Sequence, residues 1–205
     1  MEINEIYGKA LAVLRSGGLL LYPTDTVWGI GCDATDPDAV AKVYALKRRS
    51  DSKSLVLLAS DLDMVARYIR EIPEMAVQLV EVNDRPMTII YPGAVAMPRP
   101  AEGEEVRKSH HLLAYNTVAE DGSVGIRIPD MDFCRNLVKR FGRPVVSTSA
   151  NISGEPAPGN FSEISRAIRE GVDYIVDPEL EKGATGKSSS IIKVGLDATI
   201  EIIRK

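Results

Sequence analysis

The chain has few of the residues that crosslink small proteins or bind metals, with two cysteines and two histidines among 205 residues. Two cysteines form neither a disulfide framework nor a zinc ligand set, so we expect Cys32 and Cys134 to be small buried side chains. No run approaches the ~18 apolar residues of a membrane span, and residues 1–5 lack the basic start of a signal peptide. The sequence therefore predicts a cytoplasmic location and no membrane contact.

An excess of positive charge is also absent, since 25 Lys and Arg face 29 Asp and Glu, giving a formal net charge of -4. This balance excludes a global basic field that would hold nucleic acid non-specifically, so any site for a polyanion must be local. With 44% hydrophobic and 26% charged residues, the composition excludes collagen, a coiled coil and extended disorder. The length fits a single domain over residues 1–205.

Apolar periodicity and capping residues predict alternating helices and strands. Asp36 is a suitable N-cap, and Pro37 a suitable first residue, for a helix that ends in Lys47-Arg48-Arg49. Ser162 is expected to cap a helix that reaches Arg169. Further helices are expected at 6–14, 61–70, 73–82 and 132–141, and strands at 19–22, 55–58, 88–91, 124–128, 145–146, 190–194 and 199–203. This order predicts an α/β domain with a mixed sheet.

Residues 92–122 interrupt this pattern with Pro-Gly, Met-Pro-Arg-Pro and Glu-Gly-Glu-Glu sequences and a pair of histidines. We interpret the segment as a long surface insertion without a core face. Long loops of this kind are often lids. His110 and His111 are interpreted as solvated loop residues.

Two glycine motifs resemble nucleotide-binding loops but lack the necessary context. The stretch from Gly29 to Ala34 matches GxGxxG/A, yet it does not lie directly between a strand and a helix. Gly186-Lys187-Ser188 resembles the end of a Walker A loop, but Glu181 stands where that loop needs glycine. We expect packing glycines in the first case and a flexible polar loop in the second.

Polar residues follow the first predicted strand directly, in Tyr22-Pro23-Thr24-Asp25-Thr26. Ligands of open α/β sheets lie outside the carboxyl ends of strands, so these groups can contact a substrate. A turn whose side chains bond to their own backbone is the alternative.

A basic run, Lys47-Arg48-Arg49, ends the second predicted helix, with Lys42 and Lys53 near it. Positive charge complements a helix C-terminus, so a solvated face is one interpretation. The other is a phosphate site, for which arginine supplies a planar donor fork and lysine a point charge.

A hydroxyl-rich tract, Ser147 to Gly154, follows the strand at 145–146. Its hydroxyl, amide and backbone N–H groups can hold phosphate or ribose oxygens, although a chain of Ser and Thr turns is also possible. Together with the two preceding segments, it predicts one cleft for an anionic, hydroxylated ligand such as a nucleotide. Arg127 is interpreted as either edge protection for its strand or an anchor for a carboxylate.

Five short segments occur in one order along the chain: Tyr22-Pro23-Thr24-Asp25-Thr26-Val27-Trp28-Gly29-Ile30-Gly31, Ala45-Leu46-Lys47-Arg48-Arg49, Arg85-Pro86-Met87-Thr88, Gly125-Ile126-Arg127-Ile128-Pro129 and Ser147 to Gly154. In this order and spacing they resemble the YrdC/Sua5 family, the threonylcarbamoyl-adenylate synthases. The resemblance implies a twisted open mixed sheet with helices around a wide cleft. It also implies a nucleotidyltransferase that converts L-threonine, bicarbonate and ATP to threonylcarbamoyl-AMP and diphosphate, toward the t6A modification of tRNA.

The same resemblance implies roles for individual residues. Lys47 and Arg49 would be catalytic and, with Lys53, would face the ATP phosphates, while Ser149, Asn151 and Arg204 would bind the nucleotide. Threonine would be held by Thr24, Thr26, Arg127 and Ser147 with a hydroxyl of Ser189 or Ser190. Mg²⁺ is expected through the substrate phosphates, without protein ligands. A contact with tRNA or with the machinery that transfers the carbamoyl group is also possible.

Two other functions remain open at this point. One is an RNA-binding module, against which the net charge of -4 weighs. The other is a regulatory nucleotide-binding or carbamoyl-phosphate-processing protein of the same fold, because a fold does not fix its chemistry.

Overall fold

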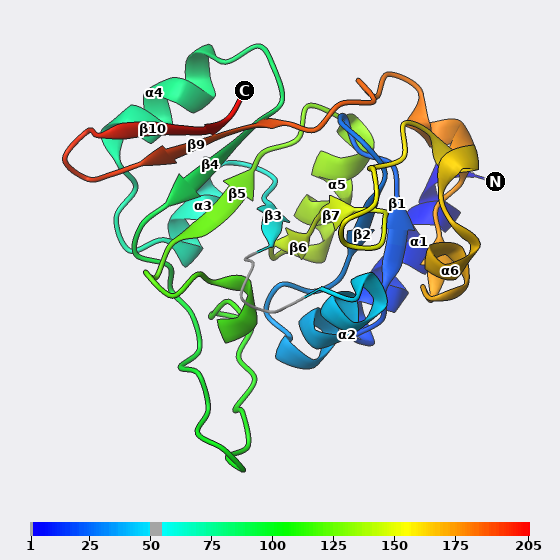
Figure 1. Ribbon diagram of the computed structural model, residues 1–205, viewed down its shortest axis with the longest axis horizontal. Helices are drawn as coiled ribbons and strands as arrows, with labels where there is room; N and C mark the ends of the chain where they lie inside the picture. Colours follow the sequence, from blue (N-terminus) through cyan, green and yellow to red (C-terminus); the bar gives the residue numbers. More distant parts are fainter. Residues whose placement is uncertain (1, 50–54) are drawn as a thin grey trace.

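The computed structural model describes residues 2–49 and 55–205 of the chain. Helices and strands alternate along most of this length, as the periodicity predicts (Figure 1). The helices are α1 (Ile3–Arg15), α2 (Pro37–Lys47), α3 (Leu62–Tyr68), α4 (Glu74–Val82), α5 (Asp132–Phe141) and α6 (Arg166–Glu170), with short 3-10 turns η1 (Tyr115–Thr117), η2 (Phe161–Glu163) and η3 (Pro178–Glu181). The strands are β1 (Leu20–Tyr22), β2 (Gly29–Gly31), β3 (Val56–Leu58), β4 (Met87–Tyr91), β5 (Val124–Arg127), β6 (Val145–Val146), β7 (Thr148–Ser149), β8 (Tyr174–Ile175), β9 (Ser190–Val194) and β10 (Ile200–Arg204).

These strands form two mixed sheets. The four-stranded sheet has the order β7-β2-β1-β8 and the six-stranded sheet the order β10-β9-β4-β5-β3-β6. Each contains parallel and antiparallel pairs, such as β3 with β5 and β4 with β5 in the larger sheet. The α/β fold with mixed pairing is therefore confirmed, and its strands are divided between two sheets, where the sequence suggests one.

The sequence analysis missed three strands, β2, β7 and β8, because each is only two or three residues long. β2 consists of the Gly29-Ile30-Gly31 stretch, and α2 begins only at Pro37. A Cβ on Gly31 would lie 2.6 Å from the Tyr22 ring and 2.9 Å from the Val146 carbonyl oxygen. Gly31 is therefore a packing glycine, as expected.

The helix starts show one correct and one wrong prediction. Asp36 caps α2 by accepting hydrogen bonds from the backbone N–H groups of Asp38 and Ala39. Ser162 does not cap a helix, because it lies inside the 3-10 turn η2, whose cap is Asn160. Ser165 caps α6 instead, which shortens the expected helix to Arg166–Glu170.

The insertion at 92–122 has a core face after all. Its middle, residues 98–111, is mostly exposed and runs over the surface as the long loop that Figure 1 shows projecting from the body. Near its end, however, Leu113 and Ala114 are fully buried, and Ala96 bridges to Leu113. This inner part was missed because it has no regular period. The segment is therefore only partly a surface loop.

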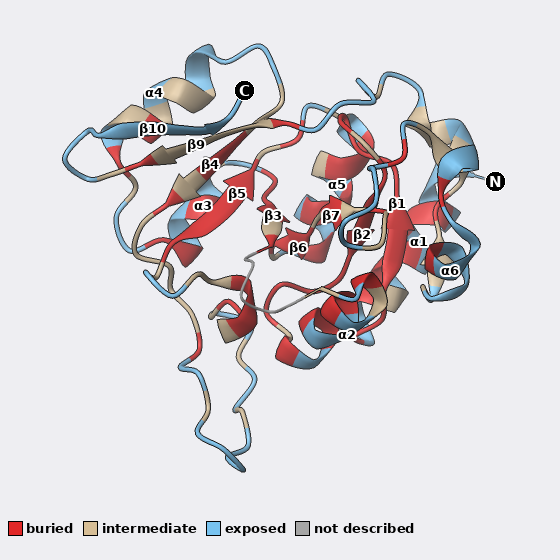
Figure 2. Ribbon diagram, viewed as in Figure 1, coloured by how far each residue is buried: buried red, intermediate tan, exposed pale blue. Residues whose placement is uncertain are grey.

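Buried side chains connect both sheets to the helices that cover them (Figure 2). α1 contributes Ile6, Ala10 and Leu14, at the spacing that predicts its inner face. Cys32 and Cys134 are both free and buried, as expected, and burial raises the pKa of each thiol. Among the described residues, no helix has the length and apolarity that crossing a membrane requires.

Candidate functional site

A cavity of about 220 Å³ lies where the two sheets meet, and we call it the serine cavity. Four serines of the 147–149 and 188–189 segments and three arginines line it. The full lining is Thr26, Val27, Trp28, Gly29, Arg49, Val56, Arg127, Ser147, Thr148, Ser149, Ser188, Ser189, Ile191 and Arg204. These residues come from segments far apart in the sequence, so only the tertiary fold assembles the site.

One wall of the serine cavity contains Arg127, which belongs to a buried ion pair. Arg127 at the end of β5 bonds through Nη1 to the Asp25 carboxylate, and Arg127 Nη2 donates to the Thr26 hydroxyl at 3.2 Å. Arg127 is 4% exposed and Asp25 5% exposed. Because a buried charge needs a partner, the pair fixes the direction of the guanidinium. Arg127 is thus a buried cation at the site and not edge protection for a strand.

Thr24 contacts Thr26 and does not itself reach the cavity. Its hydroxyl lies 2.9 Å from the Thr26 hydroxyl, donates to the Val27 carbonyl at 2.7 Å and accepts from the Thr26 N–H at 3.1 Å. Thr24 does not line the serine cavity, whereas Thr26 does. The Pro-Thr-Asp-Thr loop therefore combines both interpretations given to it, because some of its groups satisfy their own backbone while Thr26 faces the cavity.

The side chains of the basic run at the end of α2 point in different directions. Arg48 has a left-handed φ of 50° and ends the helix, and the following Arg49 N–H bonds back to the Tyr44 carbonyl at 2.9 Å. This turn leaves Arg48 exposed and brings Arg49 to the wall of the serine cavity. Burial lowers the pKa of Arg49, and an arginine side chain stays protonated in proteins. Arg49 is therefore a fixed cation at the site.

Lys47 is buried, with 2% exposure, and bonds to the hydroxyl-rich tract. Its ammonium group donates to the carbonyl oxygens of Ser149 and, at 2.7 Å, of Asn151. Burial, reinforced by the nearby Arg49, lowers the pKa of Lys47 to about 8. Lys47 thus holds the 149–151 backbone beside the cavity and does not line it.

The loop before β9 closes the site from the other side. Ser189 lines the cavity and shares a 2.8 Å hydrogen bond with the Thr88 hydroxyl, while Arg204 Nε donates to the Ser189 carbonyl at 2.9 Å. The 185–186 backbone N–H groups donate to the carbonyls of Asp25 and Thr26 at 2.9 and 2.8 Å. The Gly186 segment is therefore tied to the Pro-Thr-Asp-Thr loop, where the sequence suggests only a flexible polar loop.

Comparison with known proteins is consistent with this geometry. The Sua5/YciO/YrdC family model, described as "Telomere recombination", matches residues 12–205. The chain belongs to this family. It is 35% identical over 174 residues to the threonylcarbamoyl-AMP synthase of Chromohalobacter salexigens, covering 85% of this chain and 86% of that protein. The synthase of Cellvibrio japonicus is 32% identical, with 85% and 84% coverage.

Solved structures agree with the family fold. The P. abyssi Sua5 H234A/Y235A structure superposes with a TM-score of 0.75 at 25% identity, covering 94% of this chain and 54% of that one. This chain thus spans about half the length of that Sua5 protein. A second P. abyssi Sua5 structure, in complex with L-threonine, has a TM-score of 0.73 at 24% identity, with 95% and 52% coverage. E. coli YciO has a TM-score of 0.74 at 21% identity, with 100% and 90% coverage.

In this family member, the structure gathers most of the predicted site residues around one cavity. The predicted site residues that line it are Thr26, Arg49, Arg127, Ser147, Ser149, Ser189 and Arg204. Asn151 lies beside it, where its amide donates to the carbonyls of Ile152 and Glu155 at 3.1 and 2.7 Å. Between the two serine alternatives, Ser189 faces the cavity and Ser190 faces Pro86. Lys53 lies outside the described residues.

The sequence analysis missed Trp28, Thr148 and Ser188 as lining residues. The Trp28 ring N–H donates to the Glu181 carboxylate at 2.6 Å, and its ring packs on Phe161 with centroids 5.0 Å apart. Their positions in the sequence could have indicated these three residues. Trp28 lies in the motif at 22–31, Thr148 in the tract at 147–154, and Ser188 next to Ser189. No residue of the 92–122 insertion lines this cavity, so the structure gives no support to a lid formed by that segment.

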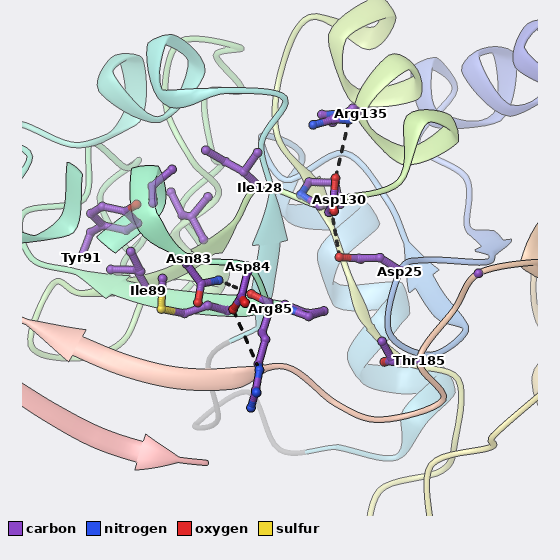
Figure 3. A pocket seen from close by; sticks show the side chains of 16 residues that line it. Asp25, Asn83, Asp84, Arg85, Ile89, Tyr91, Ile128, Asp130, Arg135 and Thr185 are labelled. Carbon is purple, nitrogen blue, oxygen red and sulfur yellow. Dashed lines mark hydrogen bonds and ion pairs between the residues drawn. The ribbon is translucent and has the colours of Figure 1, made fainter. Parts of the chain in front are cut away.

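A second, larger cavity of about 400 Å³ lies on the other face of β5 (Figure 3). Ile126 and Ile128 line it, while Arg127 between them points to the serine cavity. Asp25 belongs to the wall of this second cavity, and its other carboxylate oxygen accepts from the Asp130 N–H at 3.0 Å. The Asp25–Arg127 pair therefore separates the two cavities of this family member.

Proposed function

We propose that this chain is a threonylcarbamoyl-AMP synthase, a nucleotidyltransferase that converts L-threonine, bicarbonate and ATP to threonylcarbamoyl-AMP and diphosphate. The observation that carries the proposal is the convergence of Arg49, Arg127 and the 147–149 hydroxyl groups on one cavity. The relatives that match most of the chain carry this activity in their names. Transfer of the product to tRNA belongs to the same proposal.

The binding roles follow from charge. We assign Arg49 and Arg204 to the ATP phosphates, because both line the cavity and the planar fork of a guanidinium matches phosphate oxygens. Arg127 carries its charge next to the Thr26 hydroxyl, which suits the carboxylate and the hydroxyl of threonine. The serine hydroxyls at 147, 149 and 189 supply neutral donors and acceptors for the remaining oxygens.

The reaction needs positioning and charge stabilisation and no protein nucleophile. The threonine amine and bicarbonate form a carbamate with loss of water, and a carbamate oxygen then attacks the α-phosphorus of ATP. The new bond is O–P, the bond to the β-phosphate oxygen breaks, and diphosphate leaves with its electron pair. Arg49, held in place by the turn at Arg48, stabilises the charge that develops on the phosphate oxygens.

Lys47 has a different role from the one that the resemblance implies. Its ammonium group is already bonded to two carbonyls of the 149–151 backbone, so it acts by holding that segment and by adding positive charge near Arg49. Mg²⁺ enters the proposal as an ion carried by the phosphates. The Asp25 carboxylate is paired with Arg127, and the described residues contain no cluster of three metal-ligating side chains.

The decisive measurement is diphosphate release with ATP and bicarbonate across the amino acids. We expect turnover with threonine and none with valine, which lacks the hydroxyl that Thr26 would bind. Arg49→Gln is expected to lower turnover about 10²–10³-fold, the usual effect of removing one well-placed donor. Arg48→Gln is the matched control, because Arg48 is next to Arg49 in the sequence and its side chain is exposed. Steeply salt-dependent RNA binding without threonine-dependent diphosphate release would contradict the proposal and favour an RNA-binding module.

A further inference from the structure

A third cavity, of about 310 Å³, contains both histidines of the chain, and we call it the histidine cavity. Its lining is Arg67, Tyr68, His110, His111, Gly142 and Arg143. It shares no residue with the serine cavity. Arg143 lies just before β6 and Ser147 just after it, so the two cavities lie at opposite ends of that strand. We propose that the histidine cavity is a second anion site, which binds a phosphate group.

Each of the two arginines makes contacts within the protein that use only some of its N–H donors. Arg143 directs both Nε and Nη2 to one oxygen of Asp33, each at 2.7 Å, and its guanidinium stacks on Phe141, 4.2 Å from the ring centroid. Its Nη1 has no partner among residues 2–49 and 55–205. Arg67 donates through Nη1 to the Gly142 carbonyl at 3.3 Å, which leaves Nε and Nη2 without a described partner.

The histidines add ring nitrogens beside the two arginines. Tyr68 donates its hydroxyl to the His110 carbonyl at 2.8 Å, and His110 Nδ1 lies 3.1 Å from the Thr35 hydroxyl. The other His110 ring nitrogen and both nitrogens of His111 have no partner in the described part of the chain. Ring nitrogens and guanidinium groups of this kind are the donors that phosphate oxygens bind.

The acceptors around the histidine cavity are already used. The Asp33 carboxylate accepts from Arg143, from the Thr35 N–H at 2.9 Å and from the Thr35 hydroxyl at 2.7 Å. The Gly142 carbonyl at the end of α5 accepts from Arg67. The cavity therefore keeps two cations against one carboxylate, and the spare donors belong to the cations and histidines. This chemistry suits an oxyanion, and the same phosphate group can come from a free anion or from an RNA backbone.

The two histidines make the test specific, because the chain has no others. The full chain is titrated with inorganic phosphate, and separately with a short single-stranded RNA, while the imidazole resonances are followed by NMR at constant ionic strength set with NaCl. We expect saturable shifts of both imidazoles with phosphate. Arg67→Gln, at an exposed side chain, is expected to weaken that binding about tenfold or more, the loss of one charge-assisted hydrogen bond. Arg135→Gln, at a partly exposed arginine of α5, is the control and is expected to change nothing.

The outcomes separate the sources of the phosphate. Shifts with phosphate that Arg67→Gln weakens establish a site for a free anion. Shifts with RNA alone that Arg67→Gln weakens establish the same site for backbone phosphates. The proposal is overturned if neither ligand shifts the imidazoles, or if Arg67→Gln leaves the titration unchanged. None of these readings depends on synthase activity, so failure of the proposed function would leave this test intact.

Discussion

Asp25 and Arg127 form a buried ion pair between two cavities, with the carboxylate on the wall of the larger one and the guanidinium on the wall of the serine cavity. They lie 102 positions apart in the sequence and are each about 95% buried. Asp25 thereby sets the position of the cation that we assign to the threonine carboxylate. Its own role is that of a positioning residue, because it does not line the serine cavity.

Asp25→Asn is expected to lower the free energy of unfolding by about 3–5 kcal/mol, because it leaves the Arg127 charge buried without a counterion. Urea denaturation measures this change. Asp130→Asn, at an exposed side chain beside the same pair, is the control and is expected to stay within about 0.5 kcal/mol of the parent. Equal stability of the Asp25 variant and the parent would show that the pair does not matter for folding.

Lys47 predicts a pH dependence. Its pKa of about 8 lies below the ordinary value of 10.5, so its positive charge is complete only well below pH 8 and is lost above it. We therefore expect kcat/KM for ATP to fall above about pH 8, since this parameter reports groups of the free enzyme. Lys47→Arg keeps its charge and is expected to move that fall to higher pH. An unchanged profile in the variant would mean that another group controls the alkaline side.

Lys47→Ala also tests the fold. The structure shows that this substitution would leave the carbonyls of Ser149 and Asn151 without their Lys47 donor. We expect a loss of about 1–3 kcal/mol in unfolding free energy, together with the loss of product. Arg49→Ala is expected to abolish product with little change in stability. Thermal unfolding of the two variants side by side distinguishes these outcomes, and equal melting curves would contradict the role assigned to Lys47.

Ser189 and Ser190 are adjacent and are expected to differ in function. Ser189 lines the serine cavity, whereas the Ser190 hydroxyl faces the Pro86 carbonyl at 3.5 Å. Ser189→Ala should lower kcat/KM for threonine about threefold to tenfold, the range of one neutral hydrogen bond. Ser190→Ala should change it less than about twofold on the same scale. Steady-state kinetics with threonine as the varied substrate checks both, and the reverse order would show that the wrong serine has been assigned.

Two glycines form a matched pair for stability. Gly31→Ala would place a Cβ 2.9 Å from the Val146 carbonyl oxygen, which belongs to a buried strand and cannot move cheaply. We expect a loss of about 1–3 kcal/mol. Gly8→Ala has open space around it within α1, and we expect a gain of up to about 1 kcal/mol from helix propensity. Chemical denaturation of both variants checks the pair, and a neutral Gly31→Ala would show that β2 and β6 can separate locally.

The elements with a strong period were predictable, and the short ones were not. α1 and α5 have apolar stripes and buried faces as their patterns predict, because an amphipathic helix carries its packing information locally. β2 and β7 carry little such information, since one is Gly-Ile-Gly and the other is two hydroxyl residues. Their pairing with each other depends on β1 and on the 147–149 tract reaching the same place.

The sequence by itself determined the residue types of the candidate site, the motifs that contain them and the α/β class, because these follow from composition, periodicity and local spacing. Only the tertiary structure decided which of those residues face the serine cavity. It turned Arg49 inward at Arg48, engaged Lys47 with the 149–151 backbone, selected Ser189 over Ser190 and paired Arg127 with Asp25. The physical reason is that a side chain's direction and its counterion depend on neighbours distant in sequence, which no local pattern encodes.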